Sequence, residues 1–396
     1  MIRLMAVAAA LSASMLLVGS AASSAPAAQA AHGTASVDVV AAAASSVAEA
    51  ARDRVEAMTV REQAAAVVIG HIPSTDPAAL AAYMDTGYGG FILMGSNVPD
   101  SEDELRGIAA AMTRDPSLPP LLAIDEEGGD VTRLPWDAAP AADTLKNAHP
   151  QAVEAAFAVR GSLVARGGIS VNFGVIADVA SGPGSFIYSR SMGTDAASAA
   201  ERVAAAVRGE APFVVSTLKH FPGHGAAEGD SHHMIPSTSM SLDDWRTSTA
   251  PPFVSGVDAG AQMLMFGHLA YTAVDPLPAS LSSAWHEIAR DELGFDGVIV
   301  TDDLGMLAAT GSPEYADPGA VAVQALAAGN DLLLMVQGSD GSTAAAMVDA
   351  LVAAVDGGAL SAQRLQDAAV RVTAMRLQIG AAAPAWAPCL SCDPVG

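Results

Sequence analysis

The chain has 396 residues, of which 51% are hydrophobic and 16% are charged, so most of its length can build a folded core. Its formal net charge of −24 argues against a nucleic-acid partner and against docking on an anionic membrane. A neutral substrate such as a sugar is compatible with this charge.

The first 30 residues have the pattern of a secretory signal peptide. Arg3 is a minimal positive n-region, Met5–Val18 is an apolar stretch too short to span a bilayer comfortably, and Ala28-Gln29-Ala30 is a candidate cleavage site. An uncleaved anchor is the alternative. No cysteine follows the apolar stretch, which argues against a lipoprotein anchor. We therefore expect an exported protein, secreted or in the cell envelope, with no stable membrane insertion after cleavage.

After an Ala/Ser-rich linker over residues 31–45, helical patterns alternate with short apolar runs. Thr59 and Glu62 fit a capping box, which predicts a helix starting there. Eight apolar runs have the composition of strands, the first of them the weakest: Ala65–Ile69, Gly90–Met94, Leu121–Ile124, Ser170–Phe173, Val214–Leu218, Gln262–Phe266, Val298–Thr301 and Leu332–Met335.

Each of these runs is separated from the next by enough residues for a helix. Eight βα repeats predict an α/β fold of the (β/α)8 TIM-barrel type, as a single catalytic domain over residues 46–380. An open doubly wound sheet is the alternative, but no G-x-G-x-x-G follows the first strand. Residues 381–396 are expected to form a C-terminal tail, in which Cys389 and Cys392 could form a local disulfide.

Polar residues follow several of the predicted strands at the point where each strand ends. They are Asp125, Lys219-His220, His268 and Asp302-Asp303. A barrel enzyme assembles its active site at the carboxyl ends of its strands. Several such residues at one end of a single sheet indicate a site more strongly than any one of them alone.

The stretch from Lys219 to His233 is unusually rich in side chains that can act in catalysis. It holds four of the nine histidines and one of the two lysines. Pro222 and three nearby glycines exclude a regular helix and favour an ordered loop. A strand that ends in Lys-His and opens into such a loop predicts an active site.

Two groups could carry out glycosyl transfer. Asp302 follows a buried strand, and a carboxylate at the mouth of a barrel is a plausible nucleophile toward an anomeric carbon. Capping of the next helix is the alternative role, which we assign to Asp303. His232 lies two residues after Asp230, whose carboxylate could orient the imidazole for acid and base catalysis near neutral pH. A loop histidine in solvent is the alternative for His232.

A metal site is a competing interpretation of the same loop. His220 and His224 have the i, i+4 spacing of helical metal ligands, and Asp230, His232 and His233 lie nearby. The intervening Phe-Pro-Gly removes the helical face, so we expect no metal and no cofactor.

Asp125 could accept hydrogen bonds from sugar hydroxyls while Arg133 and Arg190 donate. Pairing of Arg133 with Asp125 or Glu127 as plain structural support is equally compatible with the spacing.

At this point the residues resemble a known family. Lys219-His-Phe-Pro-Gly-His-Gly-x4-Asp-Ser-His232 is similar to the signature of family 3 glycoside hydrolases of the single-domain β-N-acetylglucosaminidase type, which trim GlcNAc from cell-wall muropeptides. Three other stretches agree: Asp125-Glu-Glu-Gly-Gly with Arg133, Ile187-Tyr-Ser-Arg190-Ser-Met-Gly193, and Gly294-Phe-Asp-Gly-Val-Ile-Val-Thr-Asp302-Asp-Leu-Gly-Met306. The resemblance covers about residues 50–375.

The resemblance implies a role for each matching position. Asp302 would be the nucleophile of a retaining mechanism, and His232 the general acid/base with Asp230 as its partner. The substrate-binding residues would be Asp125, Arg133, Arg190, Lys219 and His220. The partner would be a small GlcNAc-containing saccharide, and we expect a monomer. Phosphorolysis, β-glucosidase activity, a catalytically weak sugar-binding wall protein and a metal-dependent hydrolase are the alternatives.

The chain departs from the family pattern at three positions near the proposed site. Glu126 stands where Gln is common, Asp130 where Arg is usual, and Met192 where Phe is common. These changes leave the catalytic positions intact, and we expect them to add negative charge near the sugar site.

Overall fold

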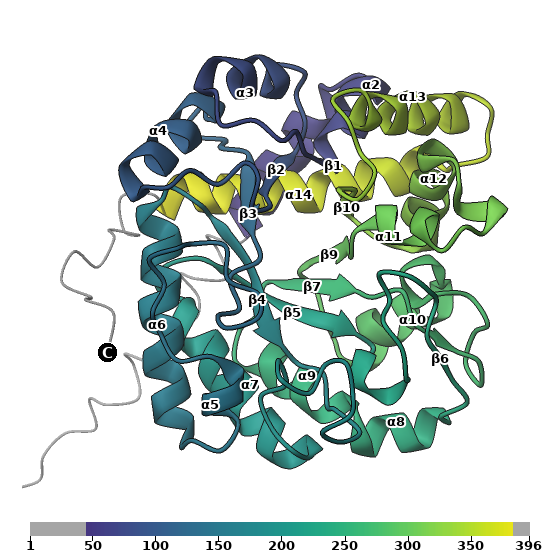
Figure 1. Cartoon of the computed structure of the whole chain (residues 1–396). Helices are drawn as coiled ribbons and strands as arrows, with labels where there is room; N and C mark the ends of the chain where they lie inside the picture. Colours follow the sequence, from purple (N-terminus) through teal and green to yellow (C-terminus); the bar gives the residue numbers. More distant parts are fainter. Residues whose placement is uncertain (1–44, 383–396) are drawn as a thin grey trace, which may run out of the picture. The chain divides into compact units, whose positions relative to one another are not determined.

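The computed structural model describes residues 45–382, and eight parallel strands form its central sheet (Figure 1). They are β1 (Val68–Gly70), β2 (Gly90–Leu93), β3 (Leu121–Ile124), β4 (Val171–Ile176), β5 (Val215–Phe221), β7 (Met263–Phe266), β9 (Val298–Thr301) and β10 (Leu333–Leu334). They pair in the order β10-β1-β2-β3-β4-β5-β7-β9. A parallel bridge between Val300 and Leu332 joins β9 to the start of β10 and closes the sheet. The predicted (β/α)8 barrel is confirmed.

Each strand lies on or beside the run that predicted it. The main difference is at β5, which continues through Lys219 and His220 to Phe221 instead of ending at Leu218. Three residues of the predicted active-site stretch, Lys219 to Phe221, are therefore held by the sheet. A separate parallel pair, β6 (Ser237–Thr238) and β8 (Ala270–Tyr271), lies outside the barrel sheet.

Helices connect the strands. They are the helix over residues 45–56, α2 (Val60–Ala66), α3 (Pro77–Met84), α4 (Glu102–Met112), α5 (Ala142–Leu145), α6 (Pro150–Arg166), α7 (Ala196–Glu210), α8 (Leu242–Ser248), α9 (Ala250–Asp258), α10 (Ser283–Glu287), α11 (Leu304–Ala309), α12 (Pro318–Ala328), α13 (Thr343–Asp356) and α14 (Ala362–Ala382). The capping box predicted at Thr59 and Glu62 is present and begins α2. Short helical turns η1 to η4 complete the connections: His224–Ala226, Ala279–Leu281, Ile288–Glu292 and Pro313–Tyr315.

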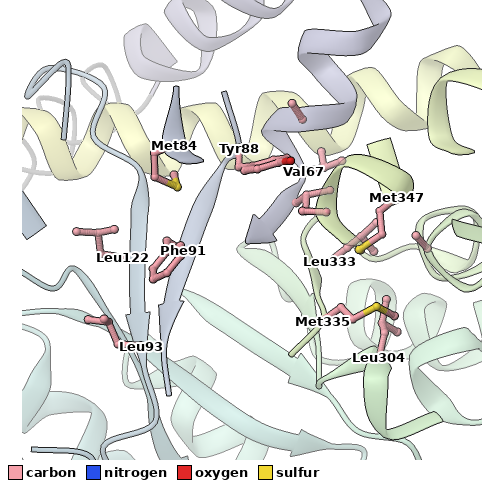
Figure 2. Packing of buried hydrophobic residues seen from close by; sticks show 14 of the residues in the cluster. Val67, Met84, Tyr88, Phe91, Leu93, Leu122, Leu304, Leu333, Met335 and Met347 are labelled. Atoms are coloured by element: carbon pink, nitrogen blue, oxygen red, sulfur yellow. The ribbon is translucent and has the colours of Figure 1, made fainter. Parts of the chain in front are cut away.

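The side chains of each strand divide between two cores, because successive residues of a strand face opposite sides. Phe91, Leu93 and Leu122 belong to the cluster between the strands and the helices, which Figure 2 shows together with Leu333 and Met347. The alternate residues fill the barrel interior with large apolar groups: Ile92, Leu121, Ala123, Phe173, Val215, Met263, Met265, Val298 and Val300.

This alternation determines which polar residues reach the mouth of the barrel. Ala123 in β3 and Val300 in β9 face inward, so Asp125 and Asp302, two residues further along, continue the inward rows. In β5 the inward Val215 is followed at even spacing by Lys219. The strand period thus brings two carboxylates and an ammonium group to one rim.

The opposite end of the barrel is covered by the last helix. Val372, Met375 and Ile379 of α14 pack against the inward-facing residues. Asp331, just before β10, forms ion pairs with Arg364 and Arg371 of this helix. The buried carboxylate therefore joins α14 to the sheet.

Several predictions fall on the chain ends. The signal peptide over residues 1–30, nearly all of the linker, and Cys389 and Cys392 lie outside the described residues. The predicted domain boundaries stay predictions for the same reason. Within residues 45–382, no helix combines the length and the apolar character needed to cross a bilayer.

Candidate active site

The carboxyl ends of the strands surround a cavity of about 230 Å³. Seven of the eight residues predicted from the sequence border it: Asp125, Arg133, Arg190, Lys219, His220, His232 and Asp302. The eighth, Asp230, does not border the cavity but contacts His232. Residues that are far apart in the chain are therefore brought together at the rim that the strand ends predict.

A buried ion network forms one wall of this cavity. Lys219 Nζ lies 2.7 Å from Asp125 Oδ1 and 2.7 Å from Glu127 Oε1, and only 3% of the lysine side chain is exposed. Arg190 forms a bidentate pair with Glu127 at 2.8 and 2.7 Å. Arg133 is more loosely placed, with Nη2 3.9 Å from Asp125 Oδ2. Arg133 therefore faces Asp125, and Glu127 pairs with Arg190; a role of these arginines in sugar binding stays a prediction.

Glu127 and Lys219 of this network are both charged near neutral pH. Burial by itself would raise the pKa of Glu127, but Lys219 and Arg190 outweigh it and hold the pKa at about 2. Burial would likewise lower the pKa of Lys219, but Asp125 and Glu127 raise it above its ordinary value. This wall therefore presents fixed charges and fixed donors to a ligand.

Asp302 and Asp303 have different environments, although they are adjacent. The Asp303 carboxylate caps α11 through Gly305 N and accepts N–H groups from Val336 and Gln337 beyond β10, at 2.7 to 2.9 Å. Capping thus belongs to Asp303, as predicted. Asp302 borders the cavity, and its Oδ1 accepts the Asp303 N–H at 2.8 Å.

Asp302 is ionised over the whole physiological range. Burial would raise its pKa, but the imidazoles of His220 and His268 and the N–H of Asp303 lower it to about 2. His268 also supports the position of this carboxylate, because its Nε2 donates to the carbonyl oxygen of Asp303 at 2.8 Å. An ionised carboxylate whose position is fixed by its neighbours is suited to act as a nucleophile.

Asp178 organises the start of the histidine-rich loop. Its carboxylate accepts hydrogen bonds from His220 N, from His220 Nδ1 at 2.7 Å, and from His224 N at 2.6 Å. His224 Nε2 lies 3.0 Å from Ser231 Oγ. The imidazole side chains of the two histidines at i, i+4 therefore bond to different partners, Asp178 and Ser231. Among residues 45–382, no three His, Cys, Asp or Glu side chains gather in a way that could hold a metal ion.

His232 lies on the loop beyond η1, and about half of its side chain is exposed. Its Nδ1 donates to Asp230 Oδ1 at 2.6 Å, which leaves Nε2 as the nitrogen available to the cavity. The ring of Phe186 lies edge-on to the His232 ring, with centroids 6.0 Å apart, and 5.5 Å from the His224 ring. Lys146 Nζ donates to the carbonyl oxygen of Tyr188 at 2.6 Å and so anchors the segment that carries Phe186.

The expectation that departures from the family pattern add negative charge near the sugar site stays a prediction, and the structure gives the surroundings of each. Glu126 is fully buried, and its Oε2 accepts the backbone N–H groups of Arg133 and Leu134. Asp130 is exposed and accepts a hydrogen bond from Ser189 Oγ at 2.6 Å. Met192 packs in an apolar cluster. None of the three borders the cavity.

Reasoning from the sequence missed three features of the candidate site: Asp178, Phe186 and the pairing of Glu127 with Lys219. Asp178 follows β4 by two residues, so the strand-end rule that identified Asp125 could have found it. Phe186 lies in an irregular segment, where no periodicity indicates its position. The partner of Glu127 is 92 residues away, and only the closed sheet brings the two together.

We expect Asp178→Asn to lower the free energy of unfolding by about 2–5 kcal/mol, because an amide leaves at least one buried N–H donor without an acceptor. Urea unfolding at pH 7 measures this. Asp130→Asn is the matched control; since that carboxylate is exposed, its effect should stay within about 0.5 kcal/mol. Equal effects of the two substitutions would show that Asp178 does not organise the loop.

Comparison with known proteins agrees with the geometry. The glycosyl hydrolase family 3 N-terminal domain matches residues 59–375. A β-hexosaminidase of Pseudomonas aeruginosa is 36% identical over 254 residues, which are 62% of this chain and 74% of that protein.

Solved structures of this family are similar as well. A family 3 β-N-acetylglucosaminidase from Paenibacillus superposes with a TM-score of 0.75 at 31% identity, covering 82% of this chain and 63% of the longer Paenibacillus chain. LpqI of M. tuberculosis superposes with a TM-score of 0.74 at 28% identity, covering 82% of this chain and 96% of that one. The chain therefore belongs to glycosyl hydrolase family 3 and is, by that membership, a glycoside hydrolase.

Proposed function

We propose that this chain is an exported, retaining β-N-acetylglucosaminidase that removes non-reducing GlcNAc from peptidoglycan fragments or related β-N-acetylhexosaminides. The single observation that carries this proposal is that Asp302 and His232 border one cavity. The names of the similar proteins, β-hexosaminidase and β-N-acetylglucosaminidase, support the choice of sugar.

In the first step, an oxygen of the Asp302 carboxylate attacks the anomeric carbon while the bond from that carbon to the leaving oxygen breaks. The His232 imidazolium gives its Nε2 proton to the leaving oxygen, and the Asp230 carboxylate stabilises the cation through the Nδ1 hydrogen bond. In the second step, neutral His232 takes a proton from water. The resulting hydroxide bonds to the anomeric carbon and releases the Asp302 carboxylate, so the configuration is retained.

The buried ion network is suited to holding the sugar that reacts. Asp125 offers acceptor oxygens, and Arg133, Arg190 and Lys219 offer donors from the same wall. Because salt bridges fix Asp125, Lys219 and Arg190 before a ligand arrives, these side chains need little further ordering on binding. Any loss of activity at acid pH should not come from protonation of Asp302, because its pKa of about 2 keeps it ionised.

Asp302→Asn should lower kcat for 4-nitrophenyl β-N-acetylglucosaminide by at least about 10³-fold, because an amide is not a nucleophile toward the anomeric carbon. Release of 4-nitrophenol, with no metal added and with EDTA present, is the measurement. Circular dichroism checks that the variant is folded. Activity that survives the substitution, or wild-type activity that EDTA abolishes, would contradict the mechanism.

His232→Ala should cost about 10²–10⁴-fold in kcat/KM for a disaccharide substrate, whose leaving group needs a proton, and much less for the 4-nitrophenyl glycoside. His233→Ala is the matched control, because that histidine is adjacent and 78% exposed. If the two variants behave alike, or if the loss at His232 does not depend on the leaving group, His232 is not the acid.

Export predicts cleavage after Ala30, because Ala28-Gln29-Ala30 follows the apolar stretch that begins at Met5. Intact-mass measurement of protein recovered from the native host's envelope and medium should give a chain that starts at Ala31. Recovery of the uncut chain from the cytosol alone would refute export, and it would leave the proposed chemistry unaffected.

A further inference from the structure

Behind the sugar-binding wall lies a group of buried ionisable side chains that the mechanism does not use. It consists of Glu126, Asp137, Arg160 and Glu210, which we call the buried carboxyl cluster; all four side chains are excluded from solvent. Asp137 Oδ2 accepts from Arg160 Nε at 2.8 Å. Glu210 accepts from Asn172 Nδ2 at 2.6 Å and from Ser216 Oγ at 2.9 Å.

The charges of this cluster do not balance. Three carboxyl groups share one guanidinium, so full ionisation would bury two uncompensated negative charges, which is strongly unfavourable. At least one carboxyl group must therefore keep its proton. Asp137 and Glu210 both accept hydrogen bonds from neighbouring donors, whereas Glu126 Oε1 has none.

The environment of Glu126 Oε1 identifies where the proton lies. This oxygen is buried and has no partner that could donate to it. The neighbouring side chain is Asp137, which can only accept. With the Asp137 carboxylate paired to Arg160, a proton on Glu126 Oε1 turns the repulsion between the two carboxyl groups into a hydrogen bond from Glu126 to Asp137.

The other carboxyl oxygen of Glu126 holds the loop that carries Arg133 and Leu134. Its Oε2 accepts the N–H groups of Arg133 and Leu134, both at 2.8 Å. Its backbone N and O bond to the side chain of Asn172 at 3.0 and 2.9 Å. Through these bonds Glu126 fixes its two neighbours, Asp125 and Glu127, together with Arg133.

We propose that Glu126 is a positioning residue that acts as a neutral carboxylic acid: it shares its proton with Asp137, and loss of that proton loosens the loop that grips the sugar. This inference rests on the proposed function for its kinetic consequence only. The protonation and its effect on stability concern the folded protein whatever its substrate.

The titration of Glu126 follows from the groups that face it. Burial and the adjacent Asp137 raise the pKa of Glu126 to about 8, against the partial effect of the Arg133 and Leu134 N–H groups. Arg160 on α6 neutralises Asp137, and Glu210 on α7, whose pKa burial raises to about 7, adds a further carboxyl group beyond Asn172. The folded state holds this proton more tightly than the unfolded chain does. The contribution of Glu126 to the free energy of unfolding is therefore fully present below about pH 4.5 and is lost as pH rises toward 8.

The decisive variant is Glu126→Gln. The amide has the shape of the protonated acid, an oxygen to accept the two N–H groups, and a nitrogen to donate to Asp137 at every pH. Wild-type KM for 4-nitrophenyl β-N-acetylglucosaminide should rise at least about tenfold between pH 7 and 9.5, with a midpoint near pH 8 and with kcat changing far less. In Glu126→Gln this rise should be absent. Glu126→Ala, which loses the acceptor, should show a raised KM at every pH.

Two further measurements do not depend on activity. Infrared difference spectra at pH 6 should show a protonated carboxylic acid band that is present in the wild type and lost in Glu126→Gln. The thermal midpoint of Glu126→Gln relative to the wild type should increase from pH 5 to pH 8. An unchanged alkaline rise in KM in Glu126→Gln, or no band assigned to Glu126, overturns the proposal. Lack of activity in the wild type with the band present would refute the proposed function and leave the neutral acid standing.

Discussion

A lysine that water barely reaches holds one wall of the candidate active site together. Lys219 Nζ bridges Asp125 after β3 and Glu127 in the following turn, and Glu127 in turn holds Arg190 from the segment after β4. Burying an ammonium group is costly unless opposite charges meet it in good geometry, and here two carboxylates do so at 2.7 Å. The same contacts that allow Lys219 to be buried thus place the donors and acceptors that face the cavity. Removal of Glu127 would take one of two carboxylate partners from Lys219 and the bidentate partner from Arg190.

The two proposed reacting groups are supported in different ways. Asp302 stands at the end of a strand, with its backbone N–H bonded to Phe266 O and the next residue fixed by His268. His232 stands on a half-exposed loop, oriented by Asp230 and flanked by Phe186. A group that forms a covalent bond gains from a rigid position, and a group that delivers and then recovers a proton must remain accessible to water. The buried carboxyl cluster adds a third kind of support, from behind the wall.

Much of this could be predicted from the sequence, for identifiable reasons. The eight strands were found because barrel strands are short apolar runs, and Asp125, Lys219 and Asp302 because polar groups at strand ends meet at one rim. The sequence also distinguished Asp303, which caps, from Asp302, which does not. The sequence could not predict ion pairs that form only when the strands assemble into a sheet, such as that of Glu127 with Lys219. The surroundings of Glu126 were also missed: its carboxyl group turns toward backbone N–H groups and the interior, which no pattern in the sequence indicates.

The central claim is that Asp302 becomes covalently bonded to the sugar while His232 serves the same glycosidic bond. Peptide mass spectrometry after treatment with a 5-fluoro N-acetylglucosaminyl fluoride, which slows the second step, tests it most directly. The account predicts a single glycosylated peptide with the label on Asp302, in the wild type and also in His232→Ala. A label on another carboxylate, or complete turnover of the reagent with no adduct at any time, would contradict it.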